Sequence, residues 1–106
     1  MIHKPINTEQ ELSELVDEMV KDLEKKLDFS KRCKVIKGKK GEKNYIINII
    51  DDDACPIITG SVIETAAEVM NAYNLFYQCL FFYHAGVYEY NGFKLPTIEL
   101  SIAGLF

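Results

Sequence analysis

Two helix-start signals divide this chain and limit the folds that it can adopt. Thr8–Glu11 and Ser61–Glu64 both read as capping boxes, in which the first hydroxyl accepts a hydrogen bond from the third following amide and the glutamate reaches back. The first box opens an apolar stripe with three- and four-residue spacing, which predicts a helix of about five turns. The second opens a segment that is apolar around much of its girth, which predicts a well-buried helix ending near Asn71 and Asn74. The stripe of the first helix consists of Leu12, Leu15, Val16, Met19, Val20, Leu23 and Leu27.

Short strand patterns fill most of the remaining chain. The predicted strands are Cys33–Lys37, Asn44–Asp51, Leu75–His84, Val87–Tyr90 and Phe93–Ala103. A polar loop over residues 38–43 joins the first two, and Ala85-Gly86 is expected to form a tight turn. Asn91-Gly92 predicts a type I′ hairpin, because that turn needs positive φ at both central residues. Pro96 suggests a bulge or an edge position in the last strand.

The predicted elements follow one another in the order α-β-β-α-β-β-β. Strands joined by short turns favour an antiparallel sheet, and two amphipathic helices favour packing on one of its faces. We therefore predict an α+β fold, a two-layer domain with a mainly antiparallel sheet and two helices packed on one face. Residues 1–106 are expected to form a single domain, since 106 residues suffice for one core.

The composition excludes several classes of protein. No segment approaches the roughly 18 apolar residues that a membrane span needs, and the polar N-terminus does not resemble a secretory signal. Cys33, Cys55 and Cys79 are odd in number and widely spaced, which favours neutral thiols in a reducing compartment over a disulfide framework or a metal site. We therefore expect a cytoplasmic protein with no cofactor and no membrane partner. Cys55 is also a possible nucleophile with His3 or His84 as its base, but no local motif supports that chemistry.

Charge is distributed very unevenly along the sequence. Residues 31–43 carry seven of the twelve basic residues and a net charge of +6, whereas residues 1–30 carry −4 and residues 44–106 carry −6. A basic segment on an acidic body steers the approach of partners more than it stabilises a fold. We expect one exposed patch that speeds docking to an acidic protein surface and on which the fold does not depend. The residues of this expected patch are Lys34, Lys37, Lys39, Lys40 and Lys43.

Aromatic residues concentrate in one third of the chain. Nine of the twelve Phe and Tyr residues lie between Tyr73 and Phe93, and both alternating faces of the strand predicted at Leu75–His84 are apolar. Two helices cover only one face of such a sheet, so the other face is expected to be buried in a homodimer. The residues expected to mediate this self-association are Phe76, Tyr77, Phe81, Phe82, Tyr83, Tyr88 and Tyr90.

Two alternative functions arise from the charged residues. Asp51, Asp52 and Asp53 end a predicted strand, and with Glu64 and Glu68 on the next helix they could hold Mg²⁺ for phosphodiesterase-like chemistry. The basic segment 31–43 could bind nucleic acid, although it lacks an aromatic residue for base stacking and the rest of the chain is acidic.

We favour neither alternative over an interaction module without enzymatic activity. A solvated acidic turn accounts for the aspartates, and a solvated loop accounts for the lysines. The expected function is therefore that of an inhibitor or adaptor, a class of small acidic protein that phages and mobile elements also encode. The sequence does not identify its protein partner.

Overall fold

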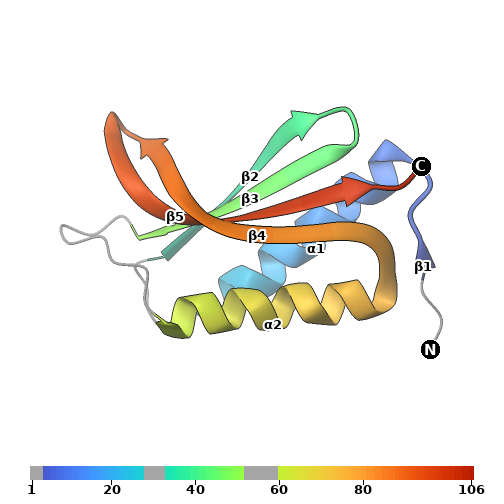
Figure 1. Cartoon of the computed structure of the whole chain (residues 1–106), viewed down its shortest axis with the longest axis horizontal. Helices are drawn as coiled ribbons and strands as arrows, with labels where there is room; N and C mark the ends of the chain where they lie inside the picture. Colours follow the sequence, from blue (N-terminus) through green and yellow to red (C-terminus); the bar gives the residue numbers. More distant parts are fainter. Residues whose placement is uncertain (1–3, 28–32, 52–59) are drawn as a thin grey trace.

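A computed structural model describes residues 4–27, 33–51 and 60–106 of the chain. Its elements are β1 (Lys4–Pro5), α1 (Glu9–Leu27), β2 (Cys33–Gly41), β3 (Asn44–Asp51), α2 (Gly60–Phe76), β4 (Tyr77–Tyr90) and β5 (Phe93–Gly104). The strands form one sheet in the order β1-β4-β5-β3-β2. Only β1 is parallel to its neighbour, and both helices lie on the same face of the sheet (Figure 1). The predicted α+β fold is therefore confirmed.

Helix α1 begins where its capping box predicts. The amide of Glu11 donates to the Thr8 hydroxyl at 3.1 Å, and that hydroxyl in turn donates to the Glu11 carboxylate at 3.3 Å. Two acidic residues in the first turn and two lysines in the last turn complement the helix dipole. The apolar stripe that follows is buried from Leu12 to Leu27, with Val20 partly buried, so the three- and four-residue spacing correctly predicts which side of α1 meets the sheet.

The core lies between the helices and one face of the three inner strands. Ile47 and Ile49 of β3 and Leu100 and Ile102 of β5 are fully buried there, together with the stripe of α1 and the inner face of α2. Burial of such side chains contributes roughly 1.5–3 kcal/mol each relative to leaving them exposed. The alternation in β5, with Ile98, Leu100 and Ile102 directed inward, is the one that the sequence predicts.

The aromatic segment differs from its prediction in one respect. β4 runs without interruption from Tyr77 to Tyr90, so the turn predicted at Ala85-Gly86 is wrong. Its pairing with β5 keeps one register along its whole length, and both residues stay in the ladder opposite Thr97 and Ile98. Positive φ occurs instead at Asn91 (52°) and Gly92 (82°), which confirms the predicted type I′ hairpin.

Three smaller differences concern two element ends and one strand that was not predicted. α2 continues past Asn71 and Asn74 to Phe76, because residues predicted to begin a strand complete its last turn. β2 extends from its predicted end at Lys37 to Gly41. β1 has no signal in the sequence, since its two residues add to β4 through tertiary contact alone.

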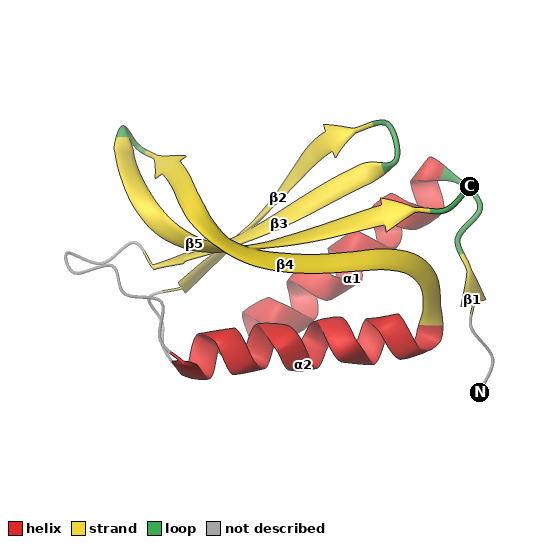
Figure 2. Ribbon diagram, in the orientation of Figure 1, coloured by secondary structure: helices red, strands yellow, loops and turns green. Residues whose placement is uncertain are grey.

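The sheet curls away from the helices and covers part of its own outer face (Figure 2). Lys34, near the start of β2, donates to the hydroxyl of Tyr90 at the end of β4 at 3.0 Å, although β3 and β5 lie between these strands. Beneath this contact, Ile50, Thr97 and Asn48 are buried on the face opposite the main core. The Thr97 hydroxyl donates to the Asn48 side-chain oxygen at 3.1 Å, which satisfies the buried amide oxygen.

Candidate functional site

An open strand edge is the first candidate site. On the side away from β5, β4 pairs only with the two residues of β1, at Tyr77 and Gln78. No other described strand pairs with that side, so the edge is open from about Phe81 to Glu89. Natural edge strands are usually short, charged or covered, because an exposed apolar edge invites pairing with another chain.

The hairpin at Asn91-Gly92 determines which backbone groups point to this edge. In a two-residue hairpin the flanking residues, here Tyr90 and Phe93, exchange both hydrogen bonds. Even-numbered residues of β4 therefore direct their amide and carbonyl groups at β5, and odd-numbered residues direct them outward. The amide of Gly104, which bonds the Lys43 carbonyl on the far side of β5 at 2.8 Å, fits the same alternation. The outward residues of the open stretch are Phe81, Tyr83, Ala85, Val87 and Glu89.

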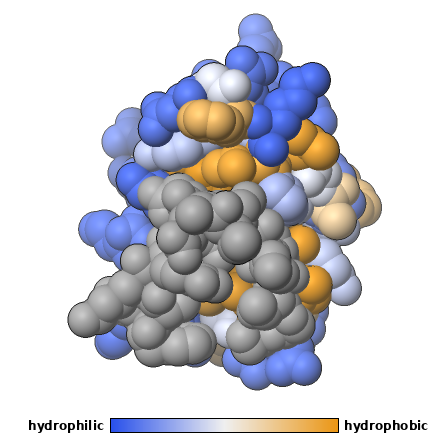
Figure 3. All heavy atoms as spheres, turned by 90° about the vertical axis from the view of Figure 1, so that its left-hand side faces the viewer, coloured by the Kyte–Doolittle hydropathy of each residue, from blue (hydrophilic) through white to orange (hydrophobic). Residues whose placement is uncertain are grey.

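Large apolar side chains remain exposed along the same edge. Phe82 is 58% exposed, Tyr83 54% and Val87 69%, and Leu80 is also exposed. Figure 3 shows that apolar side chains reach the surface among charged ones at the hairpin end of the molecule. An unpaired backbone and exposed apolar side chains thus coincide on one strand.

The seven aromatic residues predicted for self-association do not share one face. Phe81 packs against the core, and Tyr77 lies on the helix side of β4 against α1. Tyr88 and Tyr90 are half-buried on the outer face, where the curl of the sheet shelters them. Phe76 ends α2 and is exposed. Phe82 and Tyr83 are the two of the set that are exposed on the open stretch of β4.

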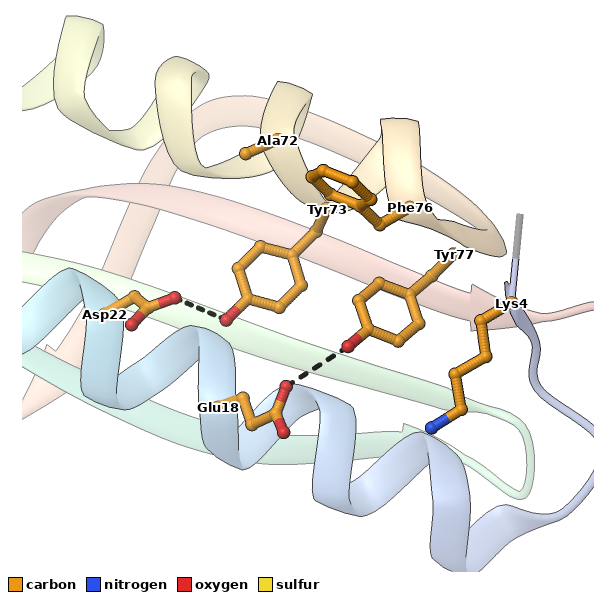
Figure 4. Close-up of a pocket in the computed structure, with 7 residues that line it drawn as sticks. All are labelled: Lys4, Glu18, Asp22, Ala72, Tyr73, Phe76 and Tyr77. Carbon is orange, nitrogen blue, oxygen red and sulfur yellow. Dashed lines mark hydrogen bonds between the residues drawn. The ribbon is translucent and has the colours of Figure 1, made fainter. Parts of the chain in front are cut away.

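A pocket of about 470 Å³ between α1, α2 and β1 is the second candidate site (Figure 4). Its aromatic wall consists of Tyr73 and Tyr77, whose rings stack with centroids 5.7 Å apart and planes 16° from parallel. Both hydroxyls point at α1, where Tyr73 donates to Asp22 and Tyr77 donates to Glu18 at 3.4 Å. Phe76, Ala72 and Lys4 complete the lining.

The environment keeps both pocket tyrosines protonated. Burial, followed by the hydrogen bond to the Asp22 carboxylate, raises the pKa of Tyr73 far above its ordinary value. Burial and the negative charge of Glu18 raise the pKa of Tyr77 as well. These hydroxyls therefore act as hydrogen-bond donors that fix the two carboxylates in place.

The structure divides the lysines expected to form one patch. Lys37 and Lys39 extend from β2 towards α1, whereas Lys34 and Lys40 contact partners on the outer face. Lys43 donates to the backbone carbonyl of Phe106. The single exposed patch expected from the sequence is therefore not what the structure shows.

Two of these lysines bind the acidic side of α1. The Lys37 ammonium lies 2.8 Å from Asp17 and 2.7 Å from the Ser13 hydroxyl, and Lys39 pairs with Glu9. The Lys39 side chain lowers the pKa of Glu9 by hydrogen bonding and by its charge. These two lysines pair with acids instead of only repelling one another, and the independence of the fold from them stays a prediction.

The residues of the predicted metal site do not form a described cluster. Asp52, Asp53 and Cys55 lie outside the described residues, as do the side chains of Asp51 and Cys33, and Glu64 and Glu68 are exposed on α2. No group of metal-ligating side chains occurs in residues 4–27, 33–51 and 60–106.

Cys79 and His84 are both on β4. Cys79 is buried, and burial raises its pKa to about 11, so its thiol is neutral. His84 is exposed on the outer face, with its ring 3.7 Å from Glu99.

Sequence reasoning did not identify Glu18, Asp22 and Tyr73 of the pocket, and it assigned Tyr77 to self-association instead. Glu18 and Asp22 are four residues apart on one flank of α1, so the spacing of this pair was a usable signal. Tyr73 and Tyr77 form a second pair across the junction between α2 and β4. That the two pairs meet depends on how α1 and α2 pack, which local patterns do not specify. Lys4 lies on β1, a strand that the sequence does not predict.

No protein-family model, curated protein or solved structure matches this chain. Neither helix in the described ranges has the length and apolar character that crossing a membrane requires. A functional assignment therefore rests on the geometry of the open edge and of the pocket.

Proposed function

We propose that this protein is a non-enzymatic protein–protein interaction module that self-associates through strand β4. The observation that carries the proposal is the open edge from Phe81 to Glu89, with exposed apolar side chains along it. Such an edge is a template for another strand, and a second copy of the chain presents the same template. In this proposal the aromatic self-association surface centres on the strand edge and includes only part of the sheet face.

Antiparallel pairing around a two-fold axis suits this edge. If the axis passes through Ala85, the open stretch of one copy lies along the whole open stretch of the other. Val87 then faces Tyr83 of the second copy, and Phe82 faces Tyr88 of the second copy, which places apolar and aromatic side chains opposite one another. The two glutamates at position 89 lie at opposite ends of the pairing, so no like charges meet.

The same register satisfies the outward backbone groups. Five residues on each copy direct an amide and a carbonyl outward, which allows up to about ten hydrogen bonds between the copies. Lysine side chains, the commonest protection of natural edges, are missing from β4. The dimer would carry a continuous sheet across both molecules.

The partner and setting of this module follow the expectations from the sequence. We propose a cytoplasmic inhibitor or adaptor, and its second partner is unidentified. The lysines remain a weaker docking surface, because Lys37 and Lys39 already bind acids of α1, and the same pairing weighs against the nucleic-acid alternative.

Light scattering coupled to size exclusion tests the proposal. At micromolar concentration the measured mass should be about twice 12.1 kDa, and it should fall towards one chain on dilution. A mass of one chain at every concentration up to the millimolar range would remove the proposal.

A further inference from the structure

The pocket between α1 and α2 has the chemistry of a cation site, and we propose that it binds the ammonium group of an aliphatic amine. Its aromatic wall and its two carboxylates converge on the same space, as Figure 4 shows. An ammonium ion is attracted both to carboxylate oxygens and to the faces of aromatic rings, and the methylene groups next to it pack on the same rings. This inference rests on the pocket and is independent of self-association through β4.

The two flanks of α1 differ in how their acids are compensated. On the flank towards β2, Glu9 pairs with Lys39 and Asp17 with Lys37. On the flank towards the pocket, none of the acidic residues lies within ion-pair distance of a basic group of the described chain. The acidic residues of this second flank are Glu11, Glu14, Glu18 and Asp22. The fold therefore compensates Glu9 and Asp17 on one flank of the helix and leaves the acids at the pocket without an ion pair in the described chain.

Hydrogen bonds position the carboxylates for a ligand. Tyr73 occupies one oxygen of Asp22 and Tyr77 one oxygen of Glu18, so each carboxylate keeps a second oxygen to accept from an ammonium group. Phe76, which is 54% exposed, stands at the rim of the pocket. Burying this ring against the methylene groups of a ligand would favour binding.

The dimensions favour a linear amine. A volume of about 470 Å³ lies within the usual range for small-molecule sites. A smaller hollow adjoins it, sharing Lys4, Glu18 and Tyr77, and adds Glu14 and Glu11 to the lining. Asp22 and Glu14 are eight residues apart on α1, or about 12 Å along the helix axis. A polyamine with ammonium groups along its chain would meet several of these acids in turn.

Lys4 allows the direction of a change in amine affinity to be predicted. It brings the chain's own ammonium group to the rim of the pocket, where it repels a second cation and weakens its binding. Lys4→Ala should therefore tighten amine binding several-fold. If the amine bound only to a diffuse acidic surface, Lys4→Ala would change its affinity much less.

The experiment is a calorimetric titration with three amines: spermidine, 1,5-diaminopentane and Nα-acetyl-lysine methylamide. We expect saturable one-to-one binding that weakens at least tenfold in Asp22→Asn and in Glu18→Gln. The matched control is Glu24→Gln, which removes the same charge from an exposed position on the other flank of α1. Circular dichroism melts establish that each variant is folded, and Lys4→Ala provides an independent test if a carboxylate variant is not.

The outcomes separate cleanly. Tighter binding of spermidine would identify a free polyamine as the ligand, and tighter binding of the lysine derivative would identify a lysine side chain of a protein partner. Either result supports the pocket. The proposal is overturned if no amine binds saturably, or if Glu24→Gln weakens binding as much as Asp22→Asn.

Discussion

Replacing Val87 by proline should separate dimerisation from folding. The amide of Val87 points away from β5, so a proline there removes no hydrogen bond of the β4–β5 ladder. The side chain is 69% exposed, and the preceding Gly86 is in an extended strand, which is the conformation that a following proline favours. The monomer should therefore lose no more than about 1 kcal/mol of unfolding free energy.

The effect on the dimer is larger and can be worked from the proposed register. Val87 of each copy donates to Tyr83 of the other, so the substitution removes two intermolecular hydrogen bonds by symmetry. At about 0.5–1.5 kcal/mol each, the loss is about 1–3 kcal/mol, which corresponds to a dissociation constant about five- to 150-fold higher. The proline ring also occupies space at the edge that the second strand needs.

Tyr88→Pro is the matched control, one residue along the same strand. The Tyr88 amide points at β5 opposite Leu95, so proline there removes a ladder hydrogen bond and leaves a carbonyl without its donor. This variant should lose about 1–3 kcal/mol of monomer stability or more. Val87→Pro should therefore weaken dimerisation more than it weakens folding, whereas Tyr88→Pro should weaken folding directly.

Sedimentation equilibrium measures the dimer constant of each variant, and thermal melts at a concentration below that constant measure the stability of the monomer. The expected pattern is a stable but monomeric Val87→Pro and a destabilised Tyr88→Pro. If Val87→Pro dimerises as tightly as the wild type, the copies do not pair through this edge. If Val87→Pro unfolds as readily as Tyr88→Pro, the assigned direction of the β4 backbone groups is wrong.

Other substitutions and conditions test the fold and the charged residues. Leu100→Ala removes a fully buried core side chain and should cost about 2–5 kcal/mol in a denaturant titration, whereas a cost below about 1 kcal/mol would contradict the described core. Lys37→Glu places a carboxylate against Asp17 and should lower the melting temperature by several degrees; an unchanged value would show that the ion pair contributes nothing. Because burial raises the pKa of Cys79 to about 11, its thiol ionises in the unfolded chain first, so its contribution to stability is complete below about pH 9 and is lost as the pH rises towards 11. Cys79→Ala should flatten the decline between these pH values relative to the wild type. Replacing Asp51–Asp53 by asparagine should change stability by less than about 0.5 kcal/mol, and calorimetry with Mg²⁺ should show no tight binding for that variant to lose.

Local signals in the sequence predicted the start of α1 and the hairpin. Thr8 caps α1 as its spacing with Glu11 predicts, and Asn91-Gly92 adopts the positive φ values that its residue types favour. These features depend on residues within four positions of one another, so neighbouring residues specify them. The apolar stripe of α1 is equally local, and it identifies the helix side that the sheet covers.

Competition between local and tertiary preferences explains the turn that failed. Ala85-Gly86 is a plausible turn in isolation, but a chain reversal there would break a ladder that continues to Tyr90 and Phe93. The long register with β5 supplies many cross-strand bonds, and a glycine within a strand is tolerated where the sheet bends. The hairpin signal six residues later is stronger, since both of its residues adopt positive φ.

The curl of the sheet explains why the outer face is less exposed than its sequence suggests. A flat sheet would leave Ile50 and Tyr90 in water on the side without helices, which is why the sequence favours a partner covering the whole face. The curl instead brings Lys34 to Tyr90 and buries Ile50 beneath. What remains for a partner is the exposed stretch of β4, where Phe82 and Val87 lie.

Charge shows the same dependence on tertiary structure, and it changes the kind of partner that the surface favours. In the sequence, the block from Lys31 to Lys43 predicts a basic surface that docks an acidic partner. In the fold, two of its lysines bind acids on one flank of α1, while Glu18 and Asp22 on the other flank line a pocket whose one basic lining residue is Lys4. Intramolecular ion pairs therefore neutralise part of the positive charge, and the negative charge that remains unpaired is concentrated at the pocket. Since uncompensated charge is what steers a partner, the stronger steering should act on cations approaching the pocket between α1 and α2.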